Sequence, residues 1–585
     1  MKHGVAFSDS IRTEKIKHYR FPDGKESSMR GKVLLVTLCI VSCIIFLKIV
    51  SLQLVRGEYY RTLSDSNRIR TKIIYAPRGV LFDRNNIPLV YNLPGFRVTK
   101  GNKTEVMSRE KALEQISQGA QNISVDSLRQ YPFKDIFSHV LGYVGQITQE
   151  EHESSDFNDY QTTDLIGKSG IEYQYEKLLR GTNGKQLLEV DATGKEVRVL
   201  GQTDPISGQD LHLTLDSKLQ QAAYNAMKDV SRGALIISTP KGEILSIISK
   251  PSFDPNLFTL GSSYTATNTA YPSISGILTG VDQPLLDRAI SGTYPPGSTF
   301  KVVMAAGALQ SKKIDTSYEV DDQGKIQIGP YTYSNWYYTD YGKTEGKISV
   351  VRALTRSDDI FFYELAAKMG LSTLVSSARQ MGVGKALGID LPGEAHGVLP
   401  DEAWKKKNVG EDWYLGDTYI YGIGQGYLLT TPLQVNAWTQ IIANGGDLYQ
   451  PHILENMGDR IITNNVLSSG TVDSVRKGMI GACDPGGTAW PLFDFKVKNP
   501  DLKVDNKNII QSASNGAEMK HVVIACKTGT AQHGGDTTPP DAWLTLFAPA
   551  YDPQIVVTVL KEDSGEGSNE AGPIAAKILD SYFGK

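Results

Sequence analysis

Ser298 and Lys301 stand three residues apart in the segment YPPGSTFK, and their types suit nucleophilic catalysis. A serine hydroxyl is a weak nucleophile until a base removes its proton. A lysine whose pKa is lowered by burial or by a nearby cation can be that base. Side chains three residues apart share one face of a helix, so the two groups would meet. The pair predicts a covalent intermediate on Ser298.

The residues around Ser298 predict that it begins a helix. Two prolines and Gly297 cannot continue a preceding helix, and the apolar run VVMAAGALQ follows. Free backbone N–H groups and the helix dipole at such a terminus favour negative charge that develops on a substrate oxygen. The serine-x-x-lysine spacing also occurs at 108–111, 238–241 and 474–477, but only the pair that begins with Ser298 follows a Pro-Pro-Gly turn.

Two further elements supply groups for the same chemistry. Ser357 opens the segment SDDIFFYELAAKMG, a loop-to-helix start from which its hydroxyl can shuttle a proton to a leaving group. The segment HVVIACKTGTAQ is predicted to form a strand in its apolar first half, and Lys527 follows that half. Gly529 would let a substrate backbone lie close to the strand edge. Together with Lys527, Thr528 and Thr530 can hold a substrate carboxylate.

These groups need a scaffold, and the sequence predicts one of mixed class. The segment GALIISTPKGEILSIIS predicts two strands joined by a Pro-Lys-Gly turn, after the helix predicted for LQQAAYNAMKDV. An antiparallel hairpin after a helix, with more helices to follow, favours an α+β domain over a doubly wound parallel sheet. Residues 75–92, with a turn at Asn85-Asn86, predict a β-rich domain before it, and the polar stretch 202–210 predicts the boundary.

One apolar segment stands apart from the rest of the chain. Residues 33–55, VLLVTLCIVSCIIFLKIVSLQLV, carry Lys48 as their single charge. At about 1.5 Å per residue, this length crosses a hydrocarbon core of about 30 Å. No alanine occurs between Ala6 and Ala76, so an A-x-A signal-peptidase site is excluded. We predict a transmembrane helix, and the lysines and arginines before it favour a cytoplasmic N-terminus.

Composition excludes several classes of protein. The net charge is −3 and the pI is near 6.3, so no basic field supports nucleic-acid binding. A mean hydropathy of −0.25 excludes a polytopic membrane protein. Cys39 and Cys43 lie in the apolar segment, which leaves only Cys483 and Cys526 elsewhere. We expect these two to be too few for a disulfide scaffold, and Cys526 to be a small buried side chain.

The order of the motifs along the chain points to a known family. Serine-x-x-lysine, serine-x-acid and lysine-threonine-glycine follow one another as they do in penicillin-recognising serine enzymes. Further matching segments, in order, are APRGVLFDRN, HVLGYVGQI, GKSGIEYQYEKLLRG, GEILSIISKPSFDPN, GIDLPGE and GDTYIYGIGQGYLLTTPLQ. The chain thus resembles the class B penicillin-binding proteins, the monofunctional D,D-transpeptidases of peptidoglycan synthesis. Asp359 in place of an asparagine, together with the IGQGY block, resembles the elongation-type group, penicillin-binding protein 2.

The resemblance implies a fold and four parts. The fold is a transpeptidase domain in which helices flank an antiparallel sheet, preceded by a β-rich pedestal and one transmembrane helix. We expect a cytoplasmic tail at 1–32, the anchor at 33–55, a pedestal of the dimerisation type at 56–206 and the transpeptidase domain at 207–585.

The resemblance also implies roles for named residues. Ser298 would form the acyl-enzyme with Lys301 as its base, and Ser357 and Lys527 would relay the proton. The backbone N–H groups of Ser298 and Thr530 would form the oxyanion hole, where one donor typically contributes about 2.7–4 kcal/mol. The residues implied in substrate binding are Asp359, Thr528, Gly529 and Thr530. The resemblance implies no metal and no organic cofactor.

Partners and competing functions follow from the same resemblance. We expect stem peptides ending in D-Ala-D-Ala, β-lactams, the cytoplasmic membrane and a membrane glycosyltransferase of the elongation machinery, which serves cell shape, with the catalytic domain outside the cytoplasm. The alternatives are a β-lactamase or D,D-carboxypeptidase, which transfers the acyl group to water, and a β-lactam sensor or scaffold that does not turn over.

Three features carry open alternatives. An asparagine amide can donate to a substrate backbone, whereas an ionised Asp359 cannot, so we expect it to orient neighbouring groups or to pair with Lys301. The aromatic run at 331–342 predicts a surface hairpin, with stacking on sugars as the alternative. His533, just past the lysine-threonine-glycine strand, is expected to be a solvated loop residue, or else to contact substrate.

Overall fold

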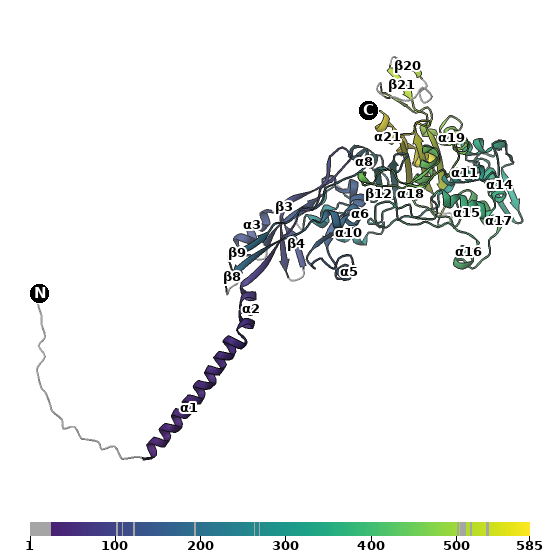
Figure 1. Cartoon of the computed structure of the whole chain (residues 1–585). Coiled ribbons are helices and arrows are strands. Elements are labelled where there is room, and N and C mark those ends of the chain that lie inside the picture. The colour runs from purple at the N-terminus through teal and green to yellow at the C-terminus, as the bar shows by residue number, and fades with distance from the viewer. Residues whose placement is uncertain are drawn as a thin grey trace. The chain divides into compact units, whose positions relative to one another are not determined.

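The computed structural model describes residues 25–584, with gaps at 101–102, 108, 121–122, 192–194, 262–263, 268, 500–501, 503–510, 515–516 and 534–537 (Figure 1). Of the tail predicted at 1–32, the first 24 residues therefore lie outside the described part. The chain forms two compact units, one of Met1–Ile73 with Lys185–Thr203 and the other of Ile74–Gly184 with Asp204–Lys585.

The first unit contains the apolar segment. Helix α1 (Lys25–Val50) continues through a π-helical turn, Ser51–Val55, and is followed by α2 (Gly57–Arg68). Among the described residues, one helix is long and apolar enough to cross a membrane, Met29–Val55. None of the residues in its most apolar stretch is buried against the rest of the protein. A three-stranded sheet completes the unit in the order β1-β8-β9, from β1 (Ile69–Ile74), β8 (Gly184–Val190) and β9 (Glu196–Thr203).

The second unit begins with a sheet of the order β10-β2-β3-β4, in which β3 also pairs with β5. Its strands are β2 (Leu81–Phe82), β3 (Pro88–Lys100), β4 (Lys103–Met107), β5 (Ile123–Gln130) and β10 (Leu211–His212). The predicted Asn85-Asn86 turn connects β2 to β3, and Asn86 takes the left-handed conformation with φ of 61°. Between β4 and β5 the chain forms one helix, α3 (Arg109–Ser117).

Buried ion pairs join two of the matching segments in this region. Arg78 of APRGVLFDRN donates to Glu172 and to Glu176, each at 2.7 Å, and both glutamates belong to GKSGIEYQYEKLLRG. Arg129 of β5 donates to the other oxygen of Glu172 at 2.6 Å. The segment GKSGIEYQYEKLLRG forms two short helices, α6 (Gly170–Gln174) and α7 (Glu176–Leu179), which meet at Tyr175.

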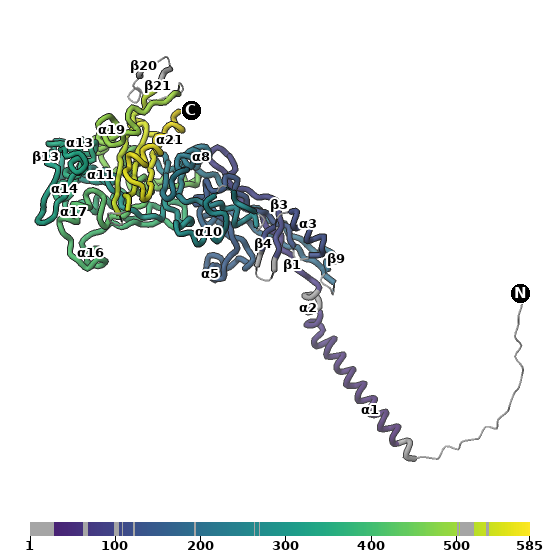
Figure 2. The backbone as a smooth tube through the Cα atoms, turned by 180° about the vertical axis from the view of Figure 1, so that it is seen from behind, coloured from purple at the N-terminus to yellow at the C-terminus, as the bar shows by residue number. Residues whose placement is uncertain are grey.

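The catalytic part is built on an antiparallel five-stranded sheet with the order β12-β11-β24-β23-β22. The strands are β11 (Gly233–Ser238), β12 (Ile244–Lys250), β22 (Ala525–Ala531), β23 (Asp541–Ala548) and β24 (Ile555–Lys561). The predicted hairpin is β11 and β12. Because β24 pairs with β11, segments more than 300 residues apart in the sequence lie side by side (Figure 2). This sheet and its helices confirm the predicted mixed α and β class.

Helices cover both faces of this sheet, as side-chain alternation requires. Leu235 and Ile237 of β11 pack in one apolar cluster with α8 (Ser217–Ala226) and α21 (Gly572–Phe583). Ala234 and Ile236 pack in a second cluster on the opposite face. The helices of that cluster include α11 (Lys301–Gln310), α13 (Val350–Arg356), α14 (Asp359–Met369), α15 (Leu371–Gln380), α17 (Leu415–Gly422), α18 (Pro432–Asn444) and α19 (Ser469–Cys483).

The cysteine prediction is wrong in one respect. Cys483, the last residue of α19, and Cys526, the second residue of β22, form a disulfide with their Cα atoms 5.9 Å apart. The count of cysteines could not show this, because the pairing depends on α19 packing against β22. Cys526 is fully buried, as expected, and the disulfide stands directly before Lys527.

Candidate active site

The turn that carries Ser298 is a single 3-10 turn, Gly297–Phe300, from which α11 continues at Lys301. Gly297 has φ of 51°, and its N–H donates to the carbonyl of Gly424 at 2.9 Å. A Cβ on Gly424 would lie 2.1 Å from the Gly297 carbonyl oxygen, so the glycine of IGQGY is required for this close approach. Ser298 is half-buried, at the helix start that the sequence predicts.

Lys301 is completely buried one turn below Ser298. Its Nζ lies 2.6 Å from Oδ1 of Asp359 and donates to the backbone carbonyl of Ser357 at 2.8 Å. Ser357 Oγ is 3.4 Å from the same nitrogen. The serine-x-x-lysine and serine-x-acid motifs therefore meet at the side-chain nitrogen of Lys301.

Ser357 ends α13 in the left-handed conformation, with φ of 55°. A non-glycine residue in this region is uncommon, and its strain is of the order of 1–3 kcal/mol. Its Oγ accepts a hydrogen bond from Lys527 Nζ at 2.8 Å. The Ser357 hydroxyl consequently lies between the side-chain nitrogens of two buried lysines.

Lys527 has its pKa lowered well below the ordinary value for lysine. Burial is the largest cause, the positive charge of Lys301 acts in the same direction, and the carboxylate of Asp359 opposes them. Its Nζ also donates to the carbonyl of Thr528 at 2.9 Å. A neutral amine at this position can take up a proton through the Ser357 hydroxyl.

Asp359 occupies a position where two donors converge. Its Oδ1 faces Lys301, and its Oδ2 accepts from the backbone N–H of Trp336 at 3.0 Å. A carboxylate accepts from both sides, whereas an amide would turn its NH₂ toward one of the two donors. The Trp336 N–H is thus a physical reason for a carboxylate rather than an amide at position 359.

Asn335 is a residue of the site that the sequence did not reveal. Its Nδ2 donates to Asp358 Oδ2 at 2.6 Å and to Asp322 Oδ2 at 3.0 Å, and its Oδ1 accepts from the Asp359 N–H at 3.3 Å. Burial, and then the charge of Asp322, raise the pKa of Asp358 to about 7. An asparagine before a helix is usually read as a cap, yet its side chain makes no cap hydrogen bond here.

The aromatic run at 331–342 is only partly a hairpin. Its first four residues form β15 (Tyr331–Ser334), which pairs with β14 (Lys325–Ile328). The remainder forms α12 (Trp336–Tyr341), and the start of this helix contributes the Trp336 N–H to Asp359. The run therefore includes a structural element of the site.

The lysine-threonine-glycine-threonine segment lies in β22 at the edge of the sheet, beside the turn of Ser298. A Cβ on Gly529 would lie 3.0 Å from Thr299 and 3.2 Å from the Pro296 carbonyl. Gly529 thus allows β22 to approach the turn that carries Ser298. Thr530 is exposed next to it, and its Oγ1 accepts from the Gly567 N–H at 3.3 Å.

Thr488 is a second residue that sequence reasoning missed. Its Oγ1 lies 2.7 Å from Oγ1 of Thr528, a hydrogen bond in which either can donate. The loop that carries Thr488 follows the disulfide cysteine of α19, and its Gly486 carbonyl accepts from Arg356 at 2.8 Å. Through these two hydrogen bonds, the loop contacts both the strand that carries Lys527 and Arg356, the residue before Ser357.

We predict that Thr488→Val lowers the rate of acylation by penicillin about five- to tenfold. Valine keeps the shape but removes the hydroxyl that orients Thr528, and one lost hydrogen bond is worth about 1 kcal/mol. Acylation rates measured with a fluorescent penicillin test this, and Thr488→Ser should restore the wild-type rate. Equal rates for Thr488→Val and wild type would show that the contact orients nothing.

His533 is not fully solvated, contrary to expectation. Its Nε2 lies 3.0 Å from Asp541 Oδ1 and 3.0 Å from Asp563 Oδ1, with a third of the side chain exposed. Among the described residues, these three are the cluster that could hold a metal ion. They stand apart from the cluster of Ser357 and the two lysines.

Comparisons with known proteins agree with this geometry. Residues 233–580 match the family model "Penicillin binding protein transpeptidase domain", and residues 100–213 match "Penicillin-binding Protein dimerisation domain". The peptidoglycan D,D-transpeptidase MrdA of Acinetobacter baumannii is 31% identical, with 95% of this chain and 88% of the relative covered.

Two solved structures are similar over most of the chain. The penicillin-binding protein PBP2 of Helicobacter pylori, solved in complex with MreC, has a TM-score of 0.72 and 27% identity, covering 88% of this chain and 98% of that chain. A chain of a peptidoglycan synthase complex that coordinates polymerization and crosslinking has a TM-score of 0.69 and 26% identity, covering 95% and 98%. This chain therefore belongs to the class B penicillin-binding proteins, within the penicillin-binding protein 2 (MrdA) type of peptidoglycan D,D-transpeptidases.

Proposed function

We propose that Ser298 is the residue that carries the acyl group during peptidoglycan cross-linking. Its Oγ attacks the carbonyl carbon between the two terminal D-alanines of a stem peptide. The C–N bond then breaks, and the terminal D-Ala leaves with the proton that Ser298 loses. The amine of a second stem peptide attacks the ester, forms the cross-link and returns the proton to Ser298.

The observation that carries this proposal is the position of the Ser357 hydroxyl between the side-chain nitrogens of Lys301 and Lys527. Lys301 Nζ lies 2.6 Å from the Asp359 carboxylate, whereas burial lowers the pKa of Lys527 and favours its neutral form. We assign proton uptake and return to this cluster, with Lys527 as its neutral member and Ser357 as the shuttle. Lys301, which family resemblance names as the base, supplies positive charge beside the developing oxyanion.

The remaining site residues are proposed to bind substrate. The exposed Thr530 and the backbone N–H groups of Ser298 and Thr530 would receive the substrate carbonyl oxygen. Thr528, held by Thr488, would face the terminal carboxylate, and Asp359 would orient Lys301 and the start of α12. The contacts at Gly529 support a role in positioning the nucleophile as well as in admitting substrate.

We predict that Asp359→Asn moves the acidic limb of the pH profile of acylation to lower pH. The carboxylate favours charged Lys527, so its removal lowers the pKa of Lys527 further, and neutral amine is present at lower pH. We also expect the maximal rate to fall about tenfold, because the amide cannot accept from both Lys301 and Trp336. Rates of penicillin acylation across pH test this, with the exposed Asp340→Asn as control. An unchanged profile in Asp359→Asn would contradict the orienting role.

We also propose the location and partners of the enzyme. The length and apolar character of Met29–Val55 support a single-pass anchor in the cytoplasmic membrane, with the N-terminus inside and the catalytic domain outside. We retain 56–206 for the pedestal and 207–585 for the transpeptidase domain; the family models match 100–213 and 233–580, and the first passes the proposed boundary by seven residues. The similarity to a chain of a peptidoglycan synthase complex supports a membrane glycosyltransferase of the elongation machinery as partner.

A test with a donor substrate and an amine acceptor separates this function from the alternatives. The full chain in detergent is incubated with a depsipeptide ending in D-Ala-D-lactate and a D-amino acid, and the products are quantified. We expect the aminolysis product and a long-lived penicillin adduct. Hydrolysis alone with rapid release of penicillin would indicate a β-lactamase or carboxypeptidase, and an adduct without any turnover of the depsipeptide would indicate a sensor or scaffold.

A further inference from the structure

Three side chains that the proposed chemistry does not use converge at the ends of three neighbouring strands. His533 follows the end of β22 by two residues, Asp541 is the first residue of β23, and Asp563 follows the end of β24 by two residues. The pairing of Ala531 with Asp541 keeps the first two ends adjacent. His533 Nε2 lies 3.0 Å from one carboxylate oxygen of each aspartate.

Hydrogen bonding accounts for only one of these two contacts. The imidazole Nε2 makes a hydrogen bond to Asp541 Oδ1, which also accepts from the backbone N–H of Asp563 at 3.0 Å. Asp563 Oδ1 is buried and has no hydrogen-bond partner among the described residues. The contact of Asp563 Oδ1 with Nε2 is an ion pair only if the imidazole is protonated; with a neutral imidazole the buried oxygen has no partner, which is costly.

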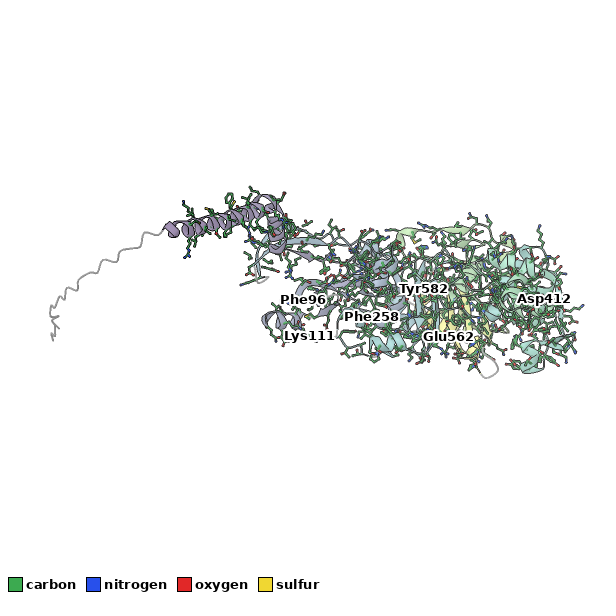
Figure 3. All side chains as sticks on the ribbon, turned by 90° about the horizontal axis from the view of Figure 1, so that it is seen from below. Phe96, Lys111, Phe258, Asp412, Glu562 and Tyr582 are labelled. Carbon is green, nitrogen blue, oxygen red and sulfur yellow. A yellow bond between two sulfur atoms is a disulfide. The ribbon has the colours of Figure 1, made fainter. Side chains whose placement is uncertain are left out.

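The surrounding charge is negative. The charged groups that face the cluster are the carboxylates of Asp282, Asp541, Glu562 and Asp563 and the guanidinium groups of Arg232 and Arg288. Glu562, labelled in Figure 3, binds both arginines, at 3.1 Å and 2.7 Å. Arg232 also binds Asp563, through Oδ2. The carboxylates that face the cluster outnumber the guanidinium groups by two.

We propose that His533 Nε2, Asp541 Oδ1 and Asp563 Oδ1 bind a divalent transition-metal ion, with zinc as the ion that fits best. Tetrahedral ligand atoms about 2.1 Å from zinc lie about 3.4 Å apart, so both nitrogen–oxygen pairs, at 3.0 Å, would have to separate by only about 0.4 Å to hold the ion. Imidazole with carboxylates suits zinc, whereas magnesium and calcium prefer oxygen alone. The ion supplies the missing positive charge and a partner for Asp563 Oδ1.

The groups around the cluster act as outer ligands do in metal sites. Arg232 holds Oδ2 of Asp563, which aims its Oδ1 at the cluster, and the Asp563 N–H holds Asp541. His533 is three residues beyond Thr530. A bound ion would therefore hold in place the end of β22, the strand that carries Lys527 and Thr530. Its role would be structural, because it would not touch the reacting atoms.

Metal binding to the untagged full chain in detergent, stripped with a chelator, tests the proposal. Titration with Zn²⁺ should show one ion per chain and a raised melting temperature. His533→Gln and Asp563→Asn should each weaken binding at least tenfold. The control Asp552→Asn removes an exposed carboxylate between the opposite ends of β23 and β24, and it should bind as wild type does.

A cobalt titration keeps the result independent of folding and of catalysis. Co²⁺ in the site should give a visible absorption band that is lost in His533→Gln. Penicillin labelling of the same variant reports separately that the domain is folded. Zinc binding that is equal in wild type and in both variants, or wild-type binding no stronger than in Asp563→Asn, would overturn the proposal.

Discussion

Ser298→Ala is expected to abolish cross-linking and covalent labelling by penicillin, with a loss of about 10⁴-fold or more in rate. The variant lacks the oxygen that forms the ester, and no neighbouring hydroxyl can replace it, because Ser357 Oγ is held by Lys527 at 2.8 Å. Ser298 is half-buried in a turn fixed by Gly297 and Gly424, so the smaller alanine should leave the fold intact. Labelling with a fluorescent penicillin measures the loss.

The sequence offers a matched control for this variant. Ser474 also stands three residues before a lysine, on α19, but its Oγ donates to the Gly470 carbonyl at 2.9 Å within that helix. Ser474→Ala should label at the wild-type rate. A persisting adduct in Ser298→Ala, or its loss in Ser474→Ala, would show that the turn at 297–300 does not carry the nucleophile.

Lys527→Met is expected to lower the rate of acylation about 10³-fold at neutral pH. Methionine fills similar space but leaves the Ser357 hydroxyl without its 2.8 Å partner and removes the neutral amine that takes up the proton. In the wild type, the rate should rise as pH increases through the lowered pKa of Lys527, because only the neutral form accepts a proton. This limb of the pH profile should disappear in the variant.

A second variant separates basicity from charge. Lys527→Arg keeps a positive charge that cannot be lost near neutral pH, so it should be as slow as Lys527→Met. Lys313→Met, at an exposed lysine after α11, serves as the control and should react normally. If Lys527→Arg retained the wild-type rate, Lys527 would act through its charge alone, and proton uptake would have to occur elsewhere.

The motifs identified the main residues of the site from sequence because each motif keeps its members close together. Ser298 and Lys301 share one turn, and Lys527 stands on one strand with Thr530. Asn335 and Thr488 could not be found this way. Each reaches the site through a long connection, and each acts through a single hydrogen-bonding side chain that no local pattern distinguishes.

Asp359 shows how far sequence reasoning could go at one position. The sequence alone indicated that an ionised carboxylate cannot donate to a substrate and can pair with Lys301. It could not show that the Trp336 N–H approaches the other carboxylate oxygen, because this depends on α12 following the β14–β15 hairpin. The choice of aspartate over asparagine becomes explicable only when both donors are in place.

The same limit applies to the fold. The β11–β12 hairpin was predictable because its turn is local, but β24 pairs with β11 across more than 300 residues. Local patterns also could not show that α19 ends against β22, which brings Cys483 to Cys526. Pairing between strands far apart in the sequence, rather than any single motif, forms the sheet whose edge strand carries Lys527.

The identity of the acylated atom is decided most directly by mass spectrometry of the full chain treated with benzylpenicillin. Tryptic cleavage after Arg288 and Lys301 would release residues 289–301, which include Ser298. We predict one penicilloyl group per chain, located by fragmentation on Ser298. No added mass, or a group located on Ser357 or any other residue, would contradict the assignment of Ser298 as the acylated residue.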